Sequence, residues 1–239
     1  MLYDGRMKNV HELWPGGPLY AGDPVGGDPL VLADFAMGLP GKSVCDLGCG
    51  SGILLLLLGI ARPELALYGA ELRPGAAEEC RRNAERNGLA DRCIVFTGDL
   101  RGCPFPAGSM DLVLSNPPFF PAVPGGVSPD PDRAAMRTES ASLPELCAAA
   151  AALLSPAGAF CLIHRRERMG NVFAALAGAG LAPRRQRFFG ADPGREPGLF
   201  LCEAGREACS GPVTEPPLYQ RRADGTETEE YRKICHWEA

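Results

Sequence analysis

The sequence lacks the features that mark membrane, secreted and metal-dependent proteins. Its longest apolar run covers residues 53–60. A membrane-spanning helix needs about 20 apolar residues, so this run is much too short. The polar N-terminus contains no apolar core of a secretory signal, so we expect a cytoplasmic protein without membrane contact. Only three histidines are present, and none of the ten cysteines forms a C-x-x-C pair. We therefore expect neither a metal site nor a disulfide framework.

An excess of positive charge, which many nucleic-acid-binding proteins carry, is also missing, since the formal net charge is −5. The charge is uneven along the chain, however. Residues 1–160 contain 12 Lys and Arg against 18 Asp and Glu, whereas residues 161–239 contain 12 against 11. The late basic residues either form solvated surfaces or bind phosphates. They cluster at residues 165–168, 184–187, 221–222 and 232–233.

The chain alternates short apolar runs with helical segments over a length that fits one α/β domain. Strands are expected at residues 43–47, 65–70, 93–97, 110–115, 158–164, 184–190 and 199–203, and helices at 28–38, 53–61, 74–87, 142–154 and 167–177. This spacing predicts a mostly parallel sheet, with the last two strands as an antiparallel hairpin at its edge. Asp28 is the expected N-cap of the first helix. We divide the chain into an N-terminal extension with a first helix that packs on the core (1–42), the main domain (43–211) and a C-terminal tail (212–239).

A glycine loop follows the first strand of this sheet. Residues 48–52 have the spacing G-x-G-x-G, which differs from the dinucleotide fingerprint G-x-G-x-x-G. The helix N-terminus behind such a loop attracts anions, but Asp46, two residues before the first glycine, would repel a pyrophosphate. An acid at this place suits a ligand with a cationic amino-acid end, and S-adenosylmethionine is such a ligand.

Two further acids stand at the ends of the next strands, where ligands of parallel sheets bind. Glu71 is placed to accept hydrogen bonds from both ribose hydroxyls, and Asp99 is placed to accept one from the adenine amine. Each acid alone could equally be a solvated strand end or a turn residue. The predicted cofactor-binding residues are Asp46, Gly48, Cys49, Gly50, Gly52, Glu71, Leu72, Asp99, Leu100 and Asn116.

The fourth strand ends in the stretch Asn116, Pro117, Pro118 and Phe119. The prolines fix φ and remove two N–H donors, so the chain leaves the sheet rigid and extended. Alone, this pattern is also that of a turn followed by a core phenylalanine. Beside the acids, the Asn116 side-chain oxygen and the Pro117 carbonyl can accept the two N–H bonds of a planar amine, on which Phe119 can stack. Asn116, Pro117 and Phe119 are therefore the predicted catalytic residues.

These motifs resemble those of class I S-adenosylmethionine-dependent methyltransferases. Residues 46–52 resemble motif I, Glu71 and Asp99 occupy the following acidic positions, and residues 116–119 resemble the motif of enzymes that methylate a planar amine. The resemblance implies a Rossmann-like α/β fold with a seven-stranded, mostly parallel sheet and helices on both faces. It also implies S-adenosyl-L-methionine as methyl donor and S-adenosyl-L-homocysteine as product.

A narrower resemblance covers nearly the whole chain and concerns the bacterial tRNA1(Val) (adenine-37-N6)-methyltransferase family. It rests on residues 26–28, 136–139, 163–166, 216–218 and 224–227, with departures at Gly27, Met136 and residues 226–228. It implies N6 of an adenosine in tRNA as the acceptor. We expect a monomer without an obligate protein partner. The candidate RNA-binding residues are Arg137, which could instead pair with Glu139, and Arg165, Arg166 and Arg168.

Other functions remain open at this point. A protein glutamine N5-methyltransferase shares Asn-Pro-Pro and an aromatic residue, but that family usually carries an additional N-terminal helical domain, whereas only about 42 residues precede the first strand here. A ribosomal RNA guanine N2-methyltransferase belongs to the same class. From another class, a nucleotide-binding module without catalysis would hold Asn116 too far from the methyl group for transfer.

Overall fold

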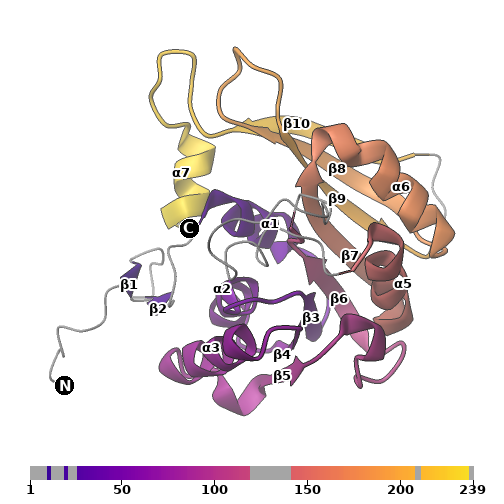
Figure 1. Cartoon of the computed structure of the whole chain (residues 1–239). Coiled ribbons are helices and arrows are strands. Elements are labelled where there is room, and N and C mark those ends of the chain that lie inside the picture. Colours follow the sequence, from indigo (N-terminus) through magenta and orange to yellow (C-terminus); the bar gives the residue numbers. More distant parts are fainter. Residues whose placement is uncertain (1–9, 12–18, 21–25, 119–140, 208–210, 237–239) are drawn as a thin grey trace, which may run out of the picture.

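The computed structural model describes residues 10–11, 19–20, 26–118, 141–207 and 211–236 (Figure 1). Among these residues, eight strands form one mixed sheet in the order β10-β8-β9-β7-β6-β3-β4-β5. Neighbouring strands are parallel except that β9 is antiparallel to both β7 and β8. The strands are β3 (Ser43–Leu47), β4 (Ala66–Glu71), β5 (Cys93–Thr97), β6 (Met110–Ser115), β7 (Leu154–Arg165), β8 (Ala182–Gly190), β9 (Leu199–Gly205) and β10 (Val213–Tyr219).

Helices cover both faces of this sheet, so two hydrophobic cores form (Figure 1). Strand side chains alternate between them: in β6, Leu112 and Leu114 belong to the core under α1, α2, α3 and α7, and Val113 to the core under α5 and α6. The predicted fold class is therefore confirmed. No helix among the described residues is long and apolar enough to span a bilayer. The helices are α1 (Gly27–Met37), α2 (Ile53–Ala61), α3 (Pro74–Arg86), α5 (Leu143–Leu153), α6 (Met169–Gly178) and α7 (Glu229–His236), with short 3-10 turns η1 (Ala90–Arg92), η2 (Leu100–Gly102) and η3 (Arg166–Arg168).

The sheet has one strand more than the sequence predicts. β10 pairs in parallel with β8 and occupies the edge, so the antiparallel pair β8–β9 does not lie at the edge as expected. The segment 212–239, predicted as a tail, contains this strand and α7. The proline pair at residues 216–217 explains the error. Proline argues against a strand because it lacks an N–H donor, but an edge strand tolerates it, and the register of β10 shifts where the pair lies.

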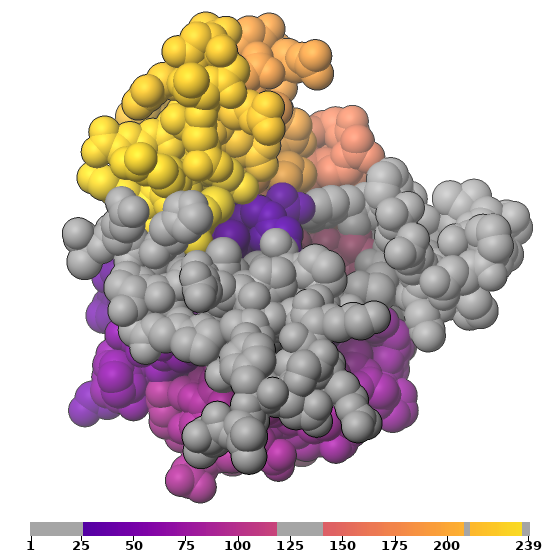
Figure 2. Space-filling view, turned by 90° about the vertical axis from the view of Figure 1, so that its left-hand side faces the viewer, coloured from indigo at the N-terminus to yellow at the C-terminus, as the bar shows by residue number. Residues whose placement is uncertain are grey.

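The N-terminal part joins the core through α1. This helix begins at Gly27 with Gly26 as its N-cap, so Asp28 lies in the first turn instead of capping the helix as predicted. Leu30 and Leu32 are buried, and α1 contacts α2, β7 and α7. The C-terminal segment, in yellow, lies directly above indigo residues of the N-terminal part in Figure 2. Before α1, β1 (Val10–His11) and β2 (Leu19–Tyr20) form a short antiparallel pair.

Candidate active site

Four polar residues that the sequence predicts at strand ends lie at the carboxyl ends of neighbouring parallel strands, which we call the carboxyl edge of the sheet. Asn116 follows β6, Asp46 lies near the end of β3, Glu71 ends β4, and Asp99 follows β5. Because β6, β3, β4 and β5 are neighbours and parallel, their carboxyl ends share this edge in that order. The direction of winding reverses between β3 and β6, and ligands of open α/β sheets bind at such a switch point. The predicted acids, the glycine loop and Asn116 are thus brought together.

The glycine loop turns most of its backbone N–H groups inward. Gly48, Gly50 and Gly52 have φ values of 82°, 54° and 88°, which favour glycine. The amides of Gly48 and Cys49 donate to the Ala70 carbonyl at 2.8 and 3.1 Å, and the Gly52 amide donates to the Cys49 carbonyl at 2.8 Å. A loop that cradles a pyrophosphate offers such amides to the ligand. The geometry therefore agrees with the sequence in disfavouring a dinucleotide.

The underside of the loop is packed against β4 and α3. A Cβ built on Gly52 would lie 2.4 Å from Cys80 Sγ, and one built on Gly69 would lie 2.8 Å from Cys49 Sγ, so these approaches require glycine. The Cys49 side chain is buried at this contact. Asn83 of α3 is fully buried and donates from Nδ2 to the carbonyl of Ser51 at 2.9 Å. Sequence reasoning missed Asn83, although a polar residue on the buried face of an amphipathic helix is a usable signal.

Asp46 is a buried carboxyl group that forms no ion pair with a cation among the described residues. Its residue is 2% exposed, and Oδ1 has no hydrogen-bond partner within the described chain. Burial, followed by the negative charge of Glu71, raises the pKa of Asp46 to about 8. A buried acceptor of this kind is stabilised by a ligand that brings a cation. The ammonium group of S-adenosylmethionine fits that requirement.

Glu71 is held mainly by backbone donors. It is 6% exposed, and the Gly50 amide donates to its Oε2 at 2.9 Å. Arg73 donates to Oε1 twice, from its backbone N at 2.9 Å and from Nε at 3.1 Å. The glycine loop and the end of β4 are thereby joined through one carboxylate, which is oriented before any ligand arrives.

Asp99 is more open than Asp46 and Glu71, and Arg101 holds it. Arg101 donates to Asp99 Oδ1 from its backbone N at 2.9 Å and from Nε at 2.8 Å, and its Nη2 contacts Oδ2. These hydrogen bonds hold the pKa of Asp99 at about 2. Arg101 Nη1 also reaches Glu145 at 2.8 Å, a member of the capping box of α5. Leu72, 47% exposed, and Leu100, half-buried, offer apolar surface beside the two acids.

The amine-binding part of the site begins directly after β6. Asn116 and Pro117 are half-buried. The residue before them, Ser115, is fully buried, and its hydroxyl donates to the Leu47 carbonyl at 2.8 Å. This bond ties the end of β6 to the end of β3 and so fixes Asn116 beside the glycine loop. No local pattern in the sequence points to Ser115, because its partner is distant along the chain. Phe119 and Arg137 lie outside the described residues.

The candidate RNA-binding arginines lie at the same edge, where β7 passes into η3. Arg165 pairs with Glu167 at 3.1 Å, and Arg166 pairs with Glu196 at 3.0 Å while its guanidinium lies 5.3 Å from the centre of the Phe188 ring. Arg168 is the last residue of η3 and is half-buried.

The basic cluster at 184–187 has a structural use. Arg185 pairs with Glu203 at 2.7 Å and with Glu215 at 3.0 Å, and its guanidinium lies 3.8 Å from the centre of the Phe35 ring. This network connects α1 with β8, β9 and β10. Arg187 similarly pairs with Glu230 of α7 at 2.6 Å. These two arginines therefore hold the C-terminal segment on the sheet.

Sequence relatives agree with the motifs. A family model described as the methyltransferase small domain matches residues 26–176. A tRNA1(Val) (adenine(37)-N6)-methyltransferase of Porphyromonas gingivalis is 32% identical over 188 residues, which are 75% of this chain and 73% of that protein. A protein of the same name from Yersinia pestis is 30% identical and aligns over 88% of this chain and 84% of its own length.

Solved structures share the fold at low identity. A protein of Agrobacterium tumefaciens described as a predicted O-methyltransferase has a TM-score of 0.70 at 17% identity, covering 87% of this chain and 94% of that one. A geranyl diphosphate C-methyltransferase from Streptomyces coelicolor, solved with S-adenosyl-L-homocysteine, has a TM-score of 0.56 at 14% identity, covering 74% and 80%. At these identities the likeness concerns the fold alone.

Proposed function

This chain belongs to the methyltransferase small domain family and is an S-adenosylmethionine-dependent methyltransferase, and we propose that it methylates N6 of an adenosine in tRNA. The names of the relatives support this acceptor, as does the Asn-Pro-Pro stretch after β6. The observation that carries the proposal is the fixed position of Asn116, which the Ser115–Leu47 hydrogen bond holds beside the glycine loop. The reaction would take place in the cytoplasm, where tRNA is found.

In this proposal the three acids hold the methyl donor. Asp46 faces its ammonium group, Glu71 accepts from the ribose hydroxyls and Asp99 accepts from the adenine amine. The buried Oδ1 of Asp46, which has no hydrogen-bond partner among the described residues, and the preoriented carboxylate of Glu71 support these assignments. Leu72 and Leu100 would pack on the adenine ring.

The reaction demands positioning more than acid or base strength. The donor supplies an electrophilic methyl group on its sulfonium, whereas the acceptor amine is a poor nucleophile because its lone pair is delocalised into the ring. Asn116 Oδ1 and the Pro117 carbonyl accept the two N–H bonds of the amine and favour its pyramidal form. The reacting atoms must then be held in line at about 3–3.5 Å. The new C–N bond forms as the C–S bond breaks, and the amine loses its proton to water afterwards.

The acceptor base has to leave its stack before it can reach Asn116, because an amine inside a stacked loop is not accessible. Phe119 is proposed to stack on the extruded base, which contributes roughly 1–3 kcal/mol. Arg165, Arg166 and Arg168, and Arg137 on the segment after Phe119, are proposed to contact phosphates. The ion pairs of Arg165 and Arg166 involve acids that are 67% and 87% exposed, so RNA can compete for both arginines.

The test offers total tRNA, ribosomal RNA and release factors from a strain that lacks the gene as substrates, with labelled S-adenosylmethionine and mass spectrometry of the nucleosides and peptides. N6-methyladenosine in tRNA, formed by the wild-type protein and not by Asn116→Ala, is the expected result. Methylated glutamine in a release factor or N2-methylguanosine in ribosomal RNA would replace the proposed acceptor. Binding of S-adenosylmethionine without methylation of any of the three would contradict the proposal.

A further inference from the structure

The Glu71 carboxylate has a limited number of acceptor positions. An ionised carboxylate has two oxygens and about four lone-pair sites. The backbone amide of Gly50 takes one site on Oε2, and the backbone amide of Arg73 takes one on Oε1. Because both donors belong to the backbone, they stay in place when a ligand binds. One site then remains on each oxygen, which matches the two hydroxyls of a ribose.

The Arg73 side chain already occupies one of these two remaining sites. Its Nε donates to Oε1 at 3.1 Å, where the Arg73 backbone amide also donates. Oε1 is therefore full, and the carboxylate can accept a single ribose hydroxyl, at Oε2. A ribose that uses both oxygens has to displace the guanidinium.

Asp99 and Arg101 provide an internal comparison, because the arginine again stands two residues after the acid. Arg101 fills Oδ1 of Asp99 and contacts Oδ2, which leaves one site on Oδ2. A single N–H of the adenine amine needs only that one site, so Arg101 can stay. Arg101 is also anchored by Glu145, whereas within the described part of the chain Glu71 is the acid that pairs with Arg73.

We infer that the Arg73 side chain competes with one ribose hydroxyl for Glu71 Oε1 and is displaced when the donor or its product binds. This inference rests on the proposed role of Glu71 in binding ribose. The Arg73 side chain is 31% exposed, so it can turn into solvent without opening the core. Arg73 thus weakens donor and product binding, whereas Arg101 strengthens it by fixing Asp99.

The two arginines should therefore respond to substitution with opposite signs. Arg73→Met keeps the length of the side chain but removes the competing donor. It should tighten binding of S-adenosyl-L-homocysteine by about two- to tenfold, the range of one partly exposed hydrogen bond. The uncharged sulfur of this product avoids a separate effect of the arginine charge on the sulfonium. Arg101→Met should weaken binding of the same ligand.

Calorimetric titration of the full chain with S-adenosyl-L-homocysteine tests the inference, with thermal unfolding to verify that each variant folds. In the Glu71→Ala background, Arg73→Met should give no further gain, because the competition acts through Glu71. Ligands that lack the 2′- or the 3′-hydroxyl sharpen the result. The gain should vanish for the analogue that lacks the hydroxyl competing with Arg73 for Oε1 and persist for the other.

The possible failures can be told apart. If Glu71→Ala leaves binding unchanged, the proposed ribose contact is wrong. If Glu71→Ala weakens binding while Arg73→Met leaves it unchanged or also weakens it, the competition is overturned and the ribose contact stands. A structure of the complex in which Arg73 Nε still donates to Oε1 would overturn the competition as well.

Discussion

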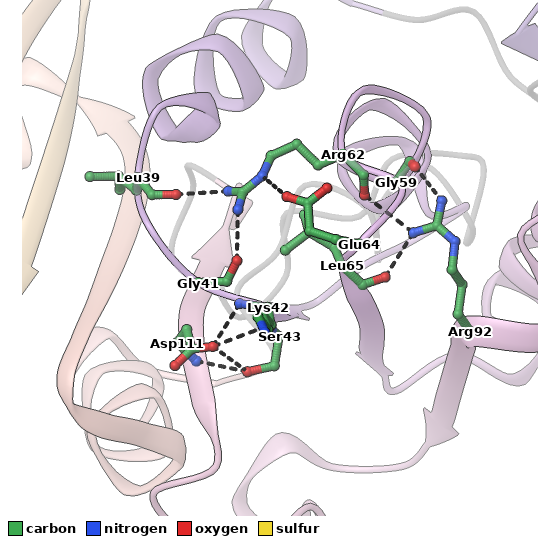
Figure 3. Close-up of polar contacts among 10 residues, drawn as sticks. All are labelled: Leu39, Gly41, Lys42, Ser43, Gly59, Arg62, Glu64, Leu65, Arg92 and Asp111. Carbon is green, nitrogen blue, oxygen red and sulfur yellow. Dashed lines mark hydrogen bonds and ion pairs between the residues drawn. The ribbon is translucent and has the colours of Figure 1, made fainter.

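The carboxyl edge of the sheet and the amino edge, where the amino ends of the same strands lie, use the same kinds of charged residue in different ways. At the amino edge, Arg62 donates from Nη1 to the Leu39 carbonyl and from Nη2 to the Gly41 carbonyl, both at 2.7 Å (Figure 3). Its Nε donates to Glu64 at 2.9 Å. At the carboxyl edge, by contrast, Oδ1 of the buried Asp46 has no hydrogen-bond partner within the described residues.

Two more charged residues of the amino edge, Arg92 and Asp111, are similarly occupied. Arg92 Nη1 donates to the Leu65 carbonyl at 2.7 Å, and its Nη2 contacts the Gly59 carbonyl (Figure 3). Asp111 Oδ2 accepts from the backbone amides of Lys42 at 2.8 Å and of Ser43 at 3.2 Å. These bonds fix the segments that lead into the strands.

Spare hydrogen-bonding capacity, and not the presence of charge, distinguishes the functional edge from the amino edge. At the amino edge, arginines saturate backbone carbonyls that would otherwise be unsatisfied. At the carboxyl edge, Glu71 and Asp99 are oriented by amides and arginines but keep acceptor sites open. Substitutions at the amino edge should therefore change the free energy of unfolding, and substitutions at the carboxyl edge should change binding or turnover.

The largest effect is expected at Asn116. Asn116→Ala should lower kcat by about a hundred- to a thousandfold, because the amine loses the acceptor that positions it. The dissociation constant of S-adenosylmethionine and the thermal unfolding temperature should remain near those of the wild type. A tritiated-methyl assay on tRNA, combined with calorimetry, measures both quantities. Full activity in this variant would remove Asn116 from the reaction.

Glu71 should show the next largest effect, on binding. Glu71→Ala removes two charge-assisted hydrogen bonds to the ligand at about 1.5 kcal/mol each, which corresponds to about a hundredfold weaker binding of S-adenosylmethionine. Glu64→Ala is the matched control, since Glu64 is an acid at the amino edge that pairs with Arg62. Calorimetry should find the control unchanged. Equal dissociation constants for both variants would mean that the acid at the carboxyl edge contributes no more to ligand binding than the acid at the amino edge.

Arg62 reverses the pattern. Arg62→Met leaves the carbonyls of Leu39 and Gly41 without their donor, so the free energy of unfolding should fall by about 2 kcal/mol, discounted because water reaches part of this edge. The affinity for S-adenosylmethionine should stay the same. Urea denaturation and calorimetry give the two values. A loss of affinity without a loss of stability would mean that the amino edge also shapes the site.

Local patterns in the sequence were sufficient to predict the carboxyl edge. Asp46, Glu71, Asp99 and Asn116 each end or follow an apolar run, and parallel strands bring such ends together. The residues that sequence reasoning missed act through partners far along the chain. The Ser115 hydroxyl donates to the carbonyl of Leu47, which lies 68 residues away along the chain. A local sequence pattern cannot reveal a partner at that separation.

The same limit applies to the arginine cluster at 184–187, for which the sequence leaves a solvated surface and phosphate binding open. Arg185 is neutralised by Glu203 and Glu215, which lie 18 and 30 residues away along the chain. The strand β10 was missed because its prolines are tolerated only at an edge, and which strand forms the edge is a property of the whole sheet.

The smallest of the expected effects concerns the pH dependence of binding at Asp46. In the free protein the raised pKa of about 8 keeps this carboxyl protonated at pH 7, with burial as the main cause and Glu71 as the second. An ammonium group binds the ionised form, so binding at pH 7 should release close to one proton, and the affinity should be about tenfold lower at pH 7 than at pH 9.

The amine of the ligand titrates in the same pH range, so its effect has to be separated from that of Asp46. The Asp46→Asn variant binds the same titrating ligand but has no carboxyl group at this position. The affinity of the wild type at each pH is therefore divided by the affinity of this variant. Calorimetry in two buffers with different ionisation enthalpies counts the released protons directly. At the amino edge Asp111 offers the opposite case, because the backbone amide of Lys42 and the hydrogen bonds of Ser43 lower its pKa and keep it ionised. A ratio to Asp46→Asn that does not change between pH 7 and pH 9 would mean that Asp46 does not meet the ammonium group, and its Oδ1, which has no partner among the described residues, would then need another one.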